Sequence, residues 1–120
     1  MVKVAIPVES ANGMLSELSD HFGMAEDFAV FEYDHGEVGD LRFIHNDPDR
    51  KPEPKTNAQF LADEDVKMVL AGFIGPHMLT VLLGEGIRVY KGAVGTLEDV
   101  LEDFKADMLT EVHTPGEMLD

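Results

Sequence analysis

The sequence predicts one α/β domain built in three layers, with a five-stranded mixed sheet between helices. A β-branched run at 2–8 opens the chain, two aromatic-rich runs at 28–33 and 41–45 flank a turn, and two short apolar runs at 67–71 and 87–90 alternate with helical patterns. A short turn joins antiparallel strands, whereas strands separated by helices are usually parallel. The sheet is therefore expected to combine an antiparallel hairpin with a parallel half.

The first strand is expected at the centre of the sheet. Residues 2–8 are apolar with little polar interruption, which is typical of a strand buried on both faces. Turn-forming residues follow over 9–20 and predict a long loop that gates access to a site. Three prolines among charged residues indicate that 46–56 is an exposed, flexible connector.

Two helices follow the connector. Thr56 followed by Gln59 fits a capping box, in which each side chain binds a free backbone N–H of the first turn, and this predicts a helix over 57–65. A second helix is expected to begin at Gly75 and Pro76, because proline is tolerated in the first turn, where its missing N–H is not needed.

The third helix has the clearest amphipathic pattern in the chain. Thr96 with Asp99 repeats the capping pattern. Apolar residues then recur at intervals of three and four and predict a buried stripe, namely Leu97, Val100, Leu101, Phe104 and Met108. The acidic tail at 110–120 contains a Pro-Gly pair and is expected to be flexible, so the domain is expected to span 1–109.

Right-handed crossovers predict the order of the strands. They place 67–71 beside the first strand and 87–90 outside it, and the order is then 41–45, 28–33, 2–8, 67–71, 87–90. The direction in which the sheet is built up reverses between the first strand and 67–71. Ligands of α/β proteins bind in the crevice that opens at the carboxyl ends of strands at such a point.

Two loops with ligand-binding residue types meet at this predicted crevice. In the loop at 19–25, His21 offers an imidazole nitrogen and Met24 a thioether to a soft metal centre. In the loop at 72–77, a helix N-terminus near Gly75 would stabilise an anion. The alternative is that His21 only bonds its own loop, Met24 fills the core and His77 is solvated, and the residue types alone leave both readings open.

Composition excludes several classes of partner. The chain has 24 acidic and 9 basic residues, a net charge of -15, which repels nucleic acids and anionic membranes. It contains no cysteine, so neither a disulfide nor a thiolate metal site forms within the chain. No run approaches the length of a membrane span or a signal peptide, and a soluble cytoplasmic protein is expected.

The sequence lacks the usual signatures of enzymes. Gly72 and Gly75 suggest a close approach of the backbone, but their spacing fits neither the dinucleotide fingerprint nor the P-loop. The chain contains no nucleophile elbow and no zinc-protease helix motif, and no two carboxylates are assigned to a paired acid-base role. We therefore expect a protein that catalyses no reaction of its own.

Four segments together resemble the dinitrogenase iron-molybdenum cofactor biosynthesis family, which includes NifX, NafY and the carboxy-terminal part of NifB. They are Val4-Ala5-Ile6-Pro7, Ser19-Asp20-His21-Phe22-Gly23 with Ala25 and Phe28, Ala71-Gly72-Phe73-Ile74-Gly75-Pro76, and Gly86-Ile87-Arg88-Val89-Tyr90 with Gly92, Gly95 and Thr96. The resemblance covers residues 1–109. The chain lacks the Gly/His-rich stretch that many small members carry between the third strand and the first long helix.

The resemblance implies a ribonuclease-H-like fold and binding of the iron-molybdenum cofactor or its iron-sulfur precursor during metallocofactor assembly, with a cofactor-assembly protein as a partner. It also implies that His21, in the His-Phe-Gly segment, is the cluster ligand. The binding residues expected from the loops and the resemblance together are His21, Phe22, Gly23, Met24, Gly72, Gly75 and His77.

Three functions follow from these observations. The first is a carrier of a metal-sulfur cluster, with His21 as ligand. The second is a non-metal interaction or regulatory module that uses its acidic surface on a basic partner. The third, metal-assisted phosphodiester hydrolysis, rests on fold analogy alone and is the weakest.

Overall fold

β1 (Val2–Val8) lies at the centre of a seven-stranded sheet in the computed structural model, which describes residues 1–119. It pairs antiparallel with β2 (Asp27–Asp34) and parallel with β5 (Met68–Leu70), and β6 (Arg88–Lys91) pairs parallel with β5. The central position of the first strand and the order of the two parallel crossovers are therefore confirmed.

The prediction of five strands is wrong, because the described residues form seven. β4 (Arg42–His45) and the very short β3 (Glu37–Val38) both pair antiparallel with β2, and β7 (Thr110–Val112) pairs antiparallel with β6. The mixed α/β class is confirmed, while the ribonuclease-H-like motif stays a prediction.

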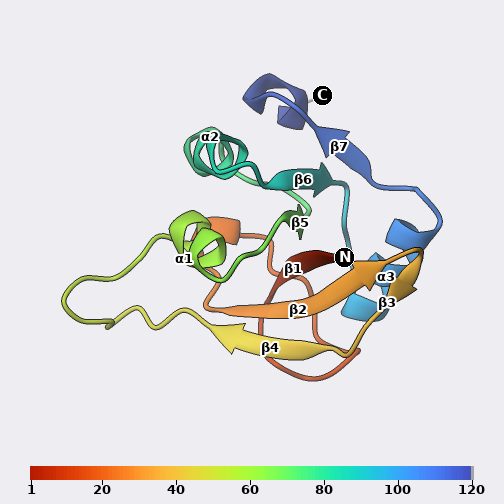
Figure 1. Ribbon diagram of the computed structural model, residues 1–120, viewed down its shortest axis with the longest axis horizontal. Coiled ribbons are helices and arrows are strands. Elements are labelled where there is room, and N and C mark those ends of the chain that lie inside the picture. The colour runs from red at the N-terminus through yellow and green to blue at the C-terminus, as the bar shows by residue number, and fades with distance from the viewer. Residues whose placement is uncertain (120) are drawn as a thin grey trace.

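Helices cover both faces of the sheet (Figure 1). α1 (Asn57–Asp63) and α2 (Pro76–Gly84) pack on one face, and α3 (Leu97–Lys105) packs on the other. Alternate residues of β1 point to opposite faces. Ala5 enters the core under α1 and α2, whereas Val4 and Ile6 enter the core under α3, and all three side chains are fully buried.

The predicted caps start two of the helices. Thr56 Oγ1 accepts a hydrogen bond from the backbone N–H of Gln59 at 3.2 Å, but the Gln59 side chain donates to Asp63 instead of returning to the cap. Thr96 and Asp99 form the full reciprocal box at the start of α3. The capping residues therefore begin both helices at the predicted places.

The predicted apolar stripe of α3 includes one residue, Met108, that lies beyond the end of the helix. The helix ends at Lys105, and Asp107 then adopts a left-handed conformation with φ 60°, which turns the chain away from the helix axis. Met108 is consequently 70% exposed, although the stripe predicted it in the core.

The loop at 9–20 is attached to the start of α3. The carbonyl groups of Met14 and Ser16 accept hydrogen bonds from the backbone N–H groups of Glu98 and Leu97, at 3.1 and 2.8 Å. These bonds satisfy first-turn donors that no helical carbonyl reaches. The loop therefore packs at one end of α3, and its role as a gate stays a prediction.

The other long segment, 46–56, runs out from β4 to α1 without helix or strand (Figure 1). Among residues 1–119, no helix has the length and apolar character needed to span a membrane.

The expectation of a flexible tail from residue 110 is wrong for 110–119. β7 extends the sheet at its edge, and a 3-10 turn at Pro115–Leu119 packs close to α2. Val112 and Met118 join the core under α1 and α2, with 1% and 6% of their surface exposed. The folded unit therefore extends past the predicted boundary at 109, and residue 120 lies outside the described residues.

Burial of β7 makes a testable prediction. We expect Val112→Ala to lower the free energy of unfolding by about 2 kcal/mol, because it removes buried methyl groups and leaves a cavity. Urea denaturation followed by circular dichroism measures this change. Thr110→Ala, at an exposed position of the same strand, serves as the control and should change the stability little. Equal stability of Val112→Ala and the parent chain would contradict the packing of this strand.

Candidate functional site

The His-Phe-Gly-Met segment forms a tight turn, η1 (Phe22–Met24), with the side chains of His21 and Met24 on the outside. The His21 carbonyl accepts hydrogen bonds from the backbone N–H groups of Met24 and Ala25, both at 3.0 Å. Phe22 is buried, and its ring meets the edge of Phe28 with the centroids 5.8 Å apart. With Phe22 fixed in the core, His21 and Met24 remain exposed, Met24 by 81%.

A buried asparagine holds this turn in place. The side-chain amide of Asn57, the first residue of α1, donates to the carbonyl groups of Phe22 at 2.6 Å and Ala25 at 2.8 Å. Asn46 Nδ2 in turn donates to Asn57 Oδ1 at 2.8 Å. Buried amide groups need such partners, so the Asn57 bonds fix the position of the exposed residues. The sequence did not predict this role, because Asn57 has no local pattern that distinguishes it from an ordinary residue after a helix cap.

The start of α2 faces the same turn. A Cβ atom added to Gly23 would lie 3.6 Å from Met78 Cε, so the two segments touch. A pocket of about 380 Å³ lies between them. This His21 pocket is lined by Asp20, His21, Phe22, Gly23, Met24, Phe73, Gly75, Pro76, His77 and Met78.

The structure thus brings six of the seven predicted site residues to one pocket. Gly72 lies outside its lining, and a Cβ atom there would come within 2.9 Å of the Ala93 carbonyl. Gly72 therefore does allow a close backbone approach, but to the loop that follows β6. Phe73 and Met78 also line the pocket but were not predicted as site residues. The signal that could have identified Phe73 is a large apolar residue in a loop next to a helix N-terminus.

The charge around the pocket is uneven. Asp20 is the one carboxylate in its lining, whereas an adjoining hollow of about 300 Å³, which shares His21 and Met24, is lined by Glu9, Glu26 and Asp27. The α2 side, with the partial positive charge of a helix N-terminus, therefore favours an anion more than the adjoining hollow does.

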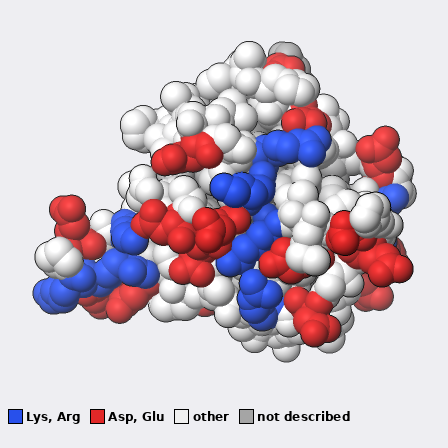
Figure 2. Space-filling view, in the orientation of Figure 1, with Lys and Arg blue, Asp and Glu red and all other residues white. Residues whose placement is uncertain are grey.

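Acidic and basic side chains also segregate over the surface. On the face shown in Figure 2, Lys and Arg side chains form a band down the middle, with Asp and Glu on both sides. The net charge of -15 is therefore unevenly distributed over this face.

The donor groups of the His21 pocket are soft or borderline ligands. Two imidazoles, from His21 and His77, and two thioethers, from Met24 and Met78, line it. Such groups suit late transition metals and metal-sulfur centres more than magnesium or calcium. Within residues 1–119 no group of three or more His, Asp or Glu side chains is arranged to hold a metal ion.

These features define a small α/β domain whose parallel strands open onto a surface pocket with imidazole and thioether groups. The sequence pattern of the dinitrogenase iron-molybdenum cofactor family matches residues 2–107, and the chain belongs to this family. Membership relates the chain to iron-molybdenum cofactor biosynthesis.

Several known proteins are similar to this chain over most of its length. The protein MJ0580 of Methanocaldococcus jannaschii is 27% identical over 106 residues, which cover 87% of this chain and 86% of that protein. The crystal structure of PH0822 has a TM-score of 0.77 and 26% identity, and the match covers 95% of this chain and 99% of that one. A NifB-like protein of Thermotoga, TM1290, has a TM-score of 0.76 and 26% identity over 95% of this chain and 96% of its own.

The Asn57 anchor is tested by Asn57→Ala. We expect this change to lower the free energy of unfolding by about 3 kcal/mol, because it leaves buried carbonyl and amide groups without partners. Urea denaturation gives the stability, and the backbone amide resonances of residues 21–25 should shift in the NMR spectrum. Gln59→Ala, on the exposed side of the same helix, is the control. If residues 21–25 keep their resonances, Asn57 does not position the turn.

A second prediction concerns pH beside the adjoining hollow. The pKa of His45 is raised above 6.5, chiefly by the hydrogen bond to Asp27 at 2.9 Å. The stabilisation from this pair is therefore complete below about pH 6.5 and is lost as the pH rises through the raised pKa. An NMR titration of the His45 ring should show a midpoint above 6.5 that Asp27→Asn lowers. Asp49→Asn should leave it unchanged, and equal midpoints in the parent and Asp27→Asn would refute the pairing.

Proposed function

We propose that this protein binds an iron-molybdenum cofactor or a related iron-sulfur cluster and carries it during metallocofactor assembly, without catalysing a reaction. The observation that carries the proposal is the shared pocket, in which the exposed His21 imidazole lies together with the first turn of α2. Membership in the iron-molybdenum cofactor family and the likeness to the NifB-like protein support it.

The ligand chemistry of the pocket suits a preassembled cluster. A cluster brings its own sulfide ligands, so the protein needs to supply few bonds to metal. An imidazole from His21 serves as the principal ligand in this proposal, and Met24, three residues further along the turn, offers a thioether beside it. Few protein ligands also favour release, which a carrier requires.

The first turn of α2 suits the negative charge of such a cargo. The backbone N–H groups of His77 and Met78 precede the first bond within the helix, from Leu79 N–H to the Gly75 carbonyl at 3.0 Å. Donors at this position have no carbonyl partner inside the helix. They therefore hold an anion, and the macrodipole adds to the attraction.

Exposed apolar side chains around the same end of the sheet support a protein partner that delivers or receives the cargo. Apolar patches of this kind usually mark interaction surfaces, and methionine adapts to different partners. The loops that follow β1, β5 and β6, together with η1, carry Met14, Leu15, Met24, Phe73 and Val94, each at least 41% exposed.

The decisive experiment is an anaerobic titration with isolated iron-molybdenum cofactor. We expect the protein to retain cofactor absorbance after gel filtration and His21→Ala to lose it, because the variant lacks the principal ligand. Circular dichroism of the variant checks that the fold is intact.

His35→Ala is the matched control, since this imidazole is 92% exposed on the hairpin turn, far along β2 from the pocket. It should bind cofactor as the parent does. Failure of the parent to bind would end the carrier proposal, and equal binding by His21→Ala would remove His21 from the ligand set.

A further inference from the structure

A pocket larger than the His21 pocket lies at the opposite end of the sheet. It has a volume of about 470 Å³ and is bordered by Val2, Met68 and Arg88, the first residues of β1, β5 and β6. The His21 pocket instead follows the carboxyl ends of the strands. Because small-molecule sites usually occupy about 300 to 1,000 Å³, the size fits a ligand.

Aromatic rings from three different elements form one wall of this cavity, which we call the tyrosine pocket after Tyr33 and Tyr90. Tyr33 of β2 and Phe104 of α3 meet edge to face with their centroids 4.8 Å apart, and Tyr90 of β6 meets Phe104 at 6.1 Å. All three rings are only half buried. Partly exposed rings held by one another present a preformed surface for another planar group.

Arg88 is held rigidly at the other wall. Its Nε and Nη2 donate to Glu111 at 3.2 and 3.0 Å, and Nη2 also donates to the Tyr90 hydroxyl at 2.8 Å. No residue among 1–119 accepts a hydrogen bond from Nη1. A guanidinium fixed on one edge and free on the other is prepared for an acceptor, since little freedom remains to be lost on binding.

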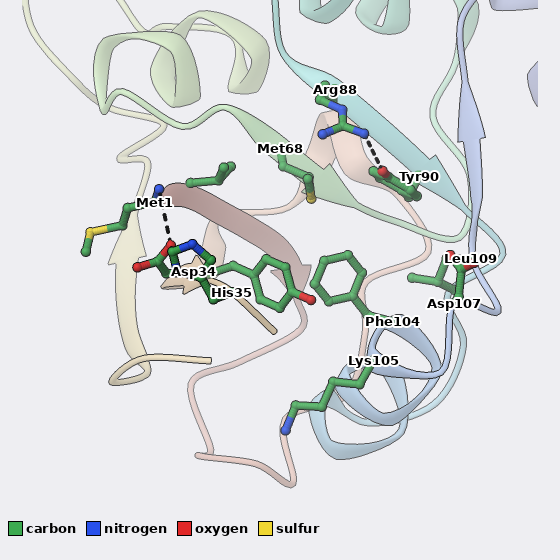
Figure 3. Close-up of a pocket in the computed structure, with 12 residues that line it drawn as sticks. Met1, Asp34, His35, Met68, Arg88, Tyr90, Phe104, Lys105, Asp107 and Leu109 are labelled. Atoms are coloured by element: carbon green, nitrogen blue, oxygen red, sulfur yellow. Dashed lines mark hydrogen bonds and ion pairs between the residues drawn. The ribbon is translucent and has the colours of Figure 1, made fainter. Parts of the chain in front are cut away.

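Phe104 and Lys105 lie across the pocket from Met68 and Arg88 (Figure 3). Lys105, in the last turn of α3, has an ammonium group without a partner in the described chain. In Figure 3 the Lys105 side chain points away from Arg88, with Phe104 between them, so Arg88 Nη1 is the free donor on which the site depends.

The local charge at this end differs from that of the whole chain. Lys3 and Lys67 lie at the same end of the sheet as Arg88, but the strand register places their side chains on the face under α1, where Lys3 Nζ donates to the Glu64 carbonyl at 2.5 Å. In the pocket itself, Arg88 is paired with Glu111 and the Met1 amino group lies 3.6 Å from Asp34 Oδ1, so that Lys105 and Asp107 leave the pocket close to neutral. Asp34 also lies 3.0 Å from His35 Nδ1. One additional negative charge is therefore tolerated here.

We propose that the tyrosine pocket binds a planar aromatic carboxylate. The ring packs against Phe104 and Tyr33, and the carboxylate accepts hydrogen bonds from Arg88 Nη1. The site is separate from the cluster proposed for the His21 pocket, and its test does not depend on that function.

The probe is 2-naphthoate, titrated into ¹⁵N-labelled protein and followed by NMR, with 2-naphthalenemethanol as its uncharged counterpart. We expect saturable shifts at Tyr33, Tyr90 and Phe104, with residues 21–25 unmoved. The alcohol should bind about tenfold more weakly, because it forms no charge-assisted hydrogen bond.

Variants separate the two parts of the site. Phe104→Leu keeps apolar volume but removes the ring, so it should weaken naphthoate binding several-fold. Arg88→Lys keeps a cation near Glu111 while removing Nη1, and should weaken it about tenfold. Phe73→Leu and Lys51→Gln, exposed positions outside the pocket, are the matched controls.

The spectra of all variants first establish that the fold is unchanged. Absence of saturable shifts at millimolar naphthoate, or shifts confined to residues 21–25, would overturn the site. Equal affinity for the alcohol, or full affinity of Arg88→Lys, would overturn the assignment of a carboxylate.

Discussion

The placement of β1 between an antiparallel and a parallel neighbour determines where ligands reach this molecule. Its core residues Val4, Ala5 and Ile6 are fully buried because helices cover both faces of the sheet. Because β5 and β6 run parallel to β1, the loops that follow these three strands meet at one end of the sheet. The first residues of the three strands meet at the other end. Both pockets follow from this topology.

Local patterns were sufficient to predict most of the regular structure. The β-branched run of β1 and the caps at Thr56 and Thr96 depend on a few neighbouring residues, so they are visible in the sequence. β7 is different. Its three residues show no usable alternation, and it exists because it pairs with β6 and buries Val112, which are contacts with distant parts of the chain. A Pro-Gly pair close by led to the prediction of a flexible tail.

The same distinction applies to the pockets. That His21 and the start of α2 share one pocket followed from the predicted strand order, since topology alone brings the two loops together. The anchor at Asn57 lies 35 residues from the Phe22 carbonyl that it binds, and no local pattern distinguishes it from a solvated asparagine. The tyrosine pocket is still harder to predict from the sequence, because its rings come from β2, β6 and α3. Its composition depends on side-chain packing, which strand order does not specify.

The two proposed anion sites are compatible with an acidic chain, because exposed charges act over short distances. At physiological ionic strength the field of an exposed charge is largely screened beyond about 8 Å. A ligand in the proposed His21 site would therefore be influenced mainly by Asp20, the N-terminus of α2 and the carboxylates of the adjoining hollow, and a ligand in the tyrosine pocket mainly by Arg88 and the carboxylates beside it. Extended polyanions such as nucleic acids contact many charges at once, so the net charge of -15 is expected to disfavour them. Small anions at the two proposed sites would instead be influenced by local charges.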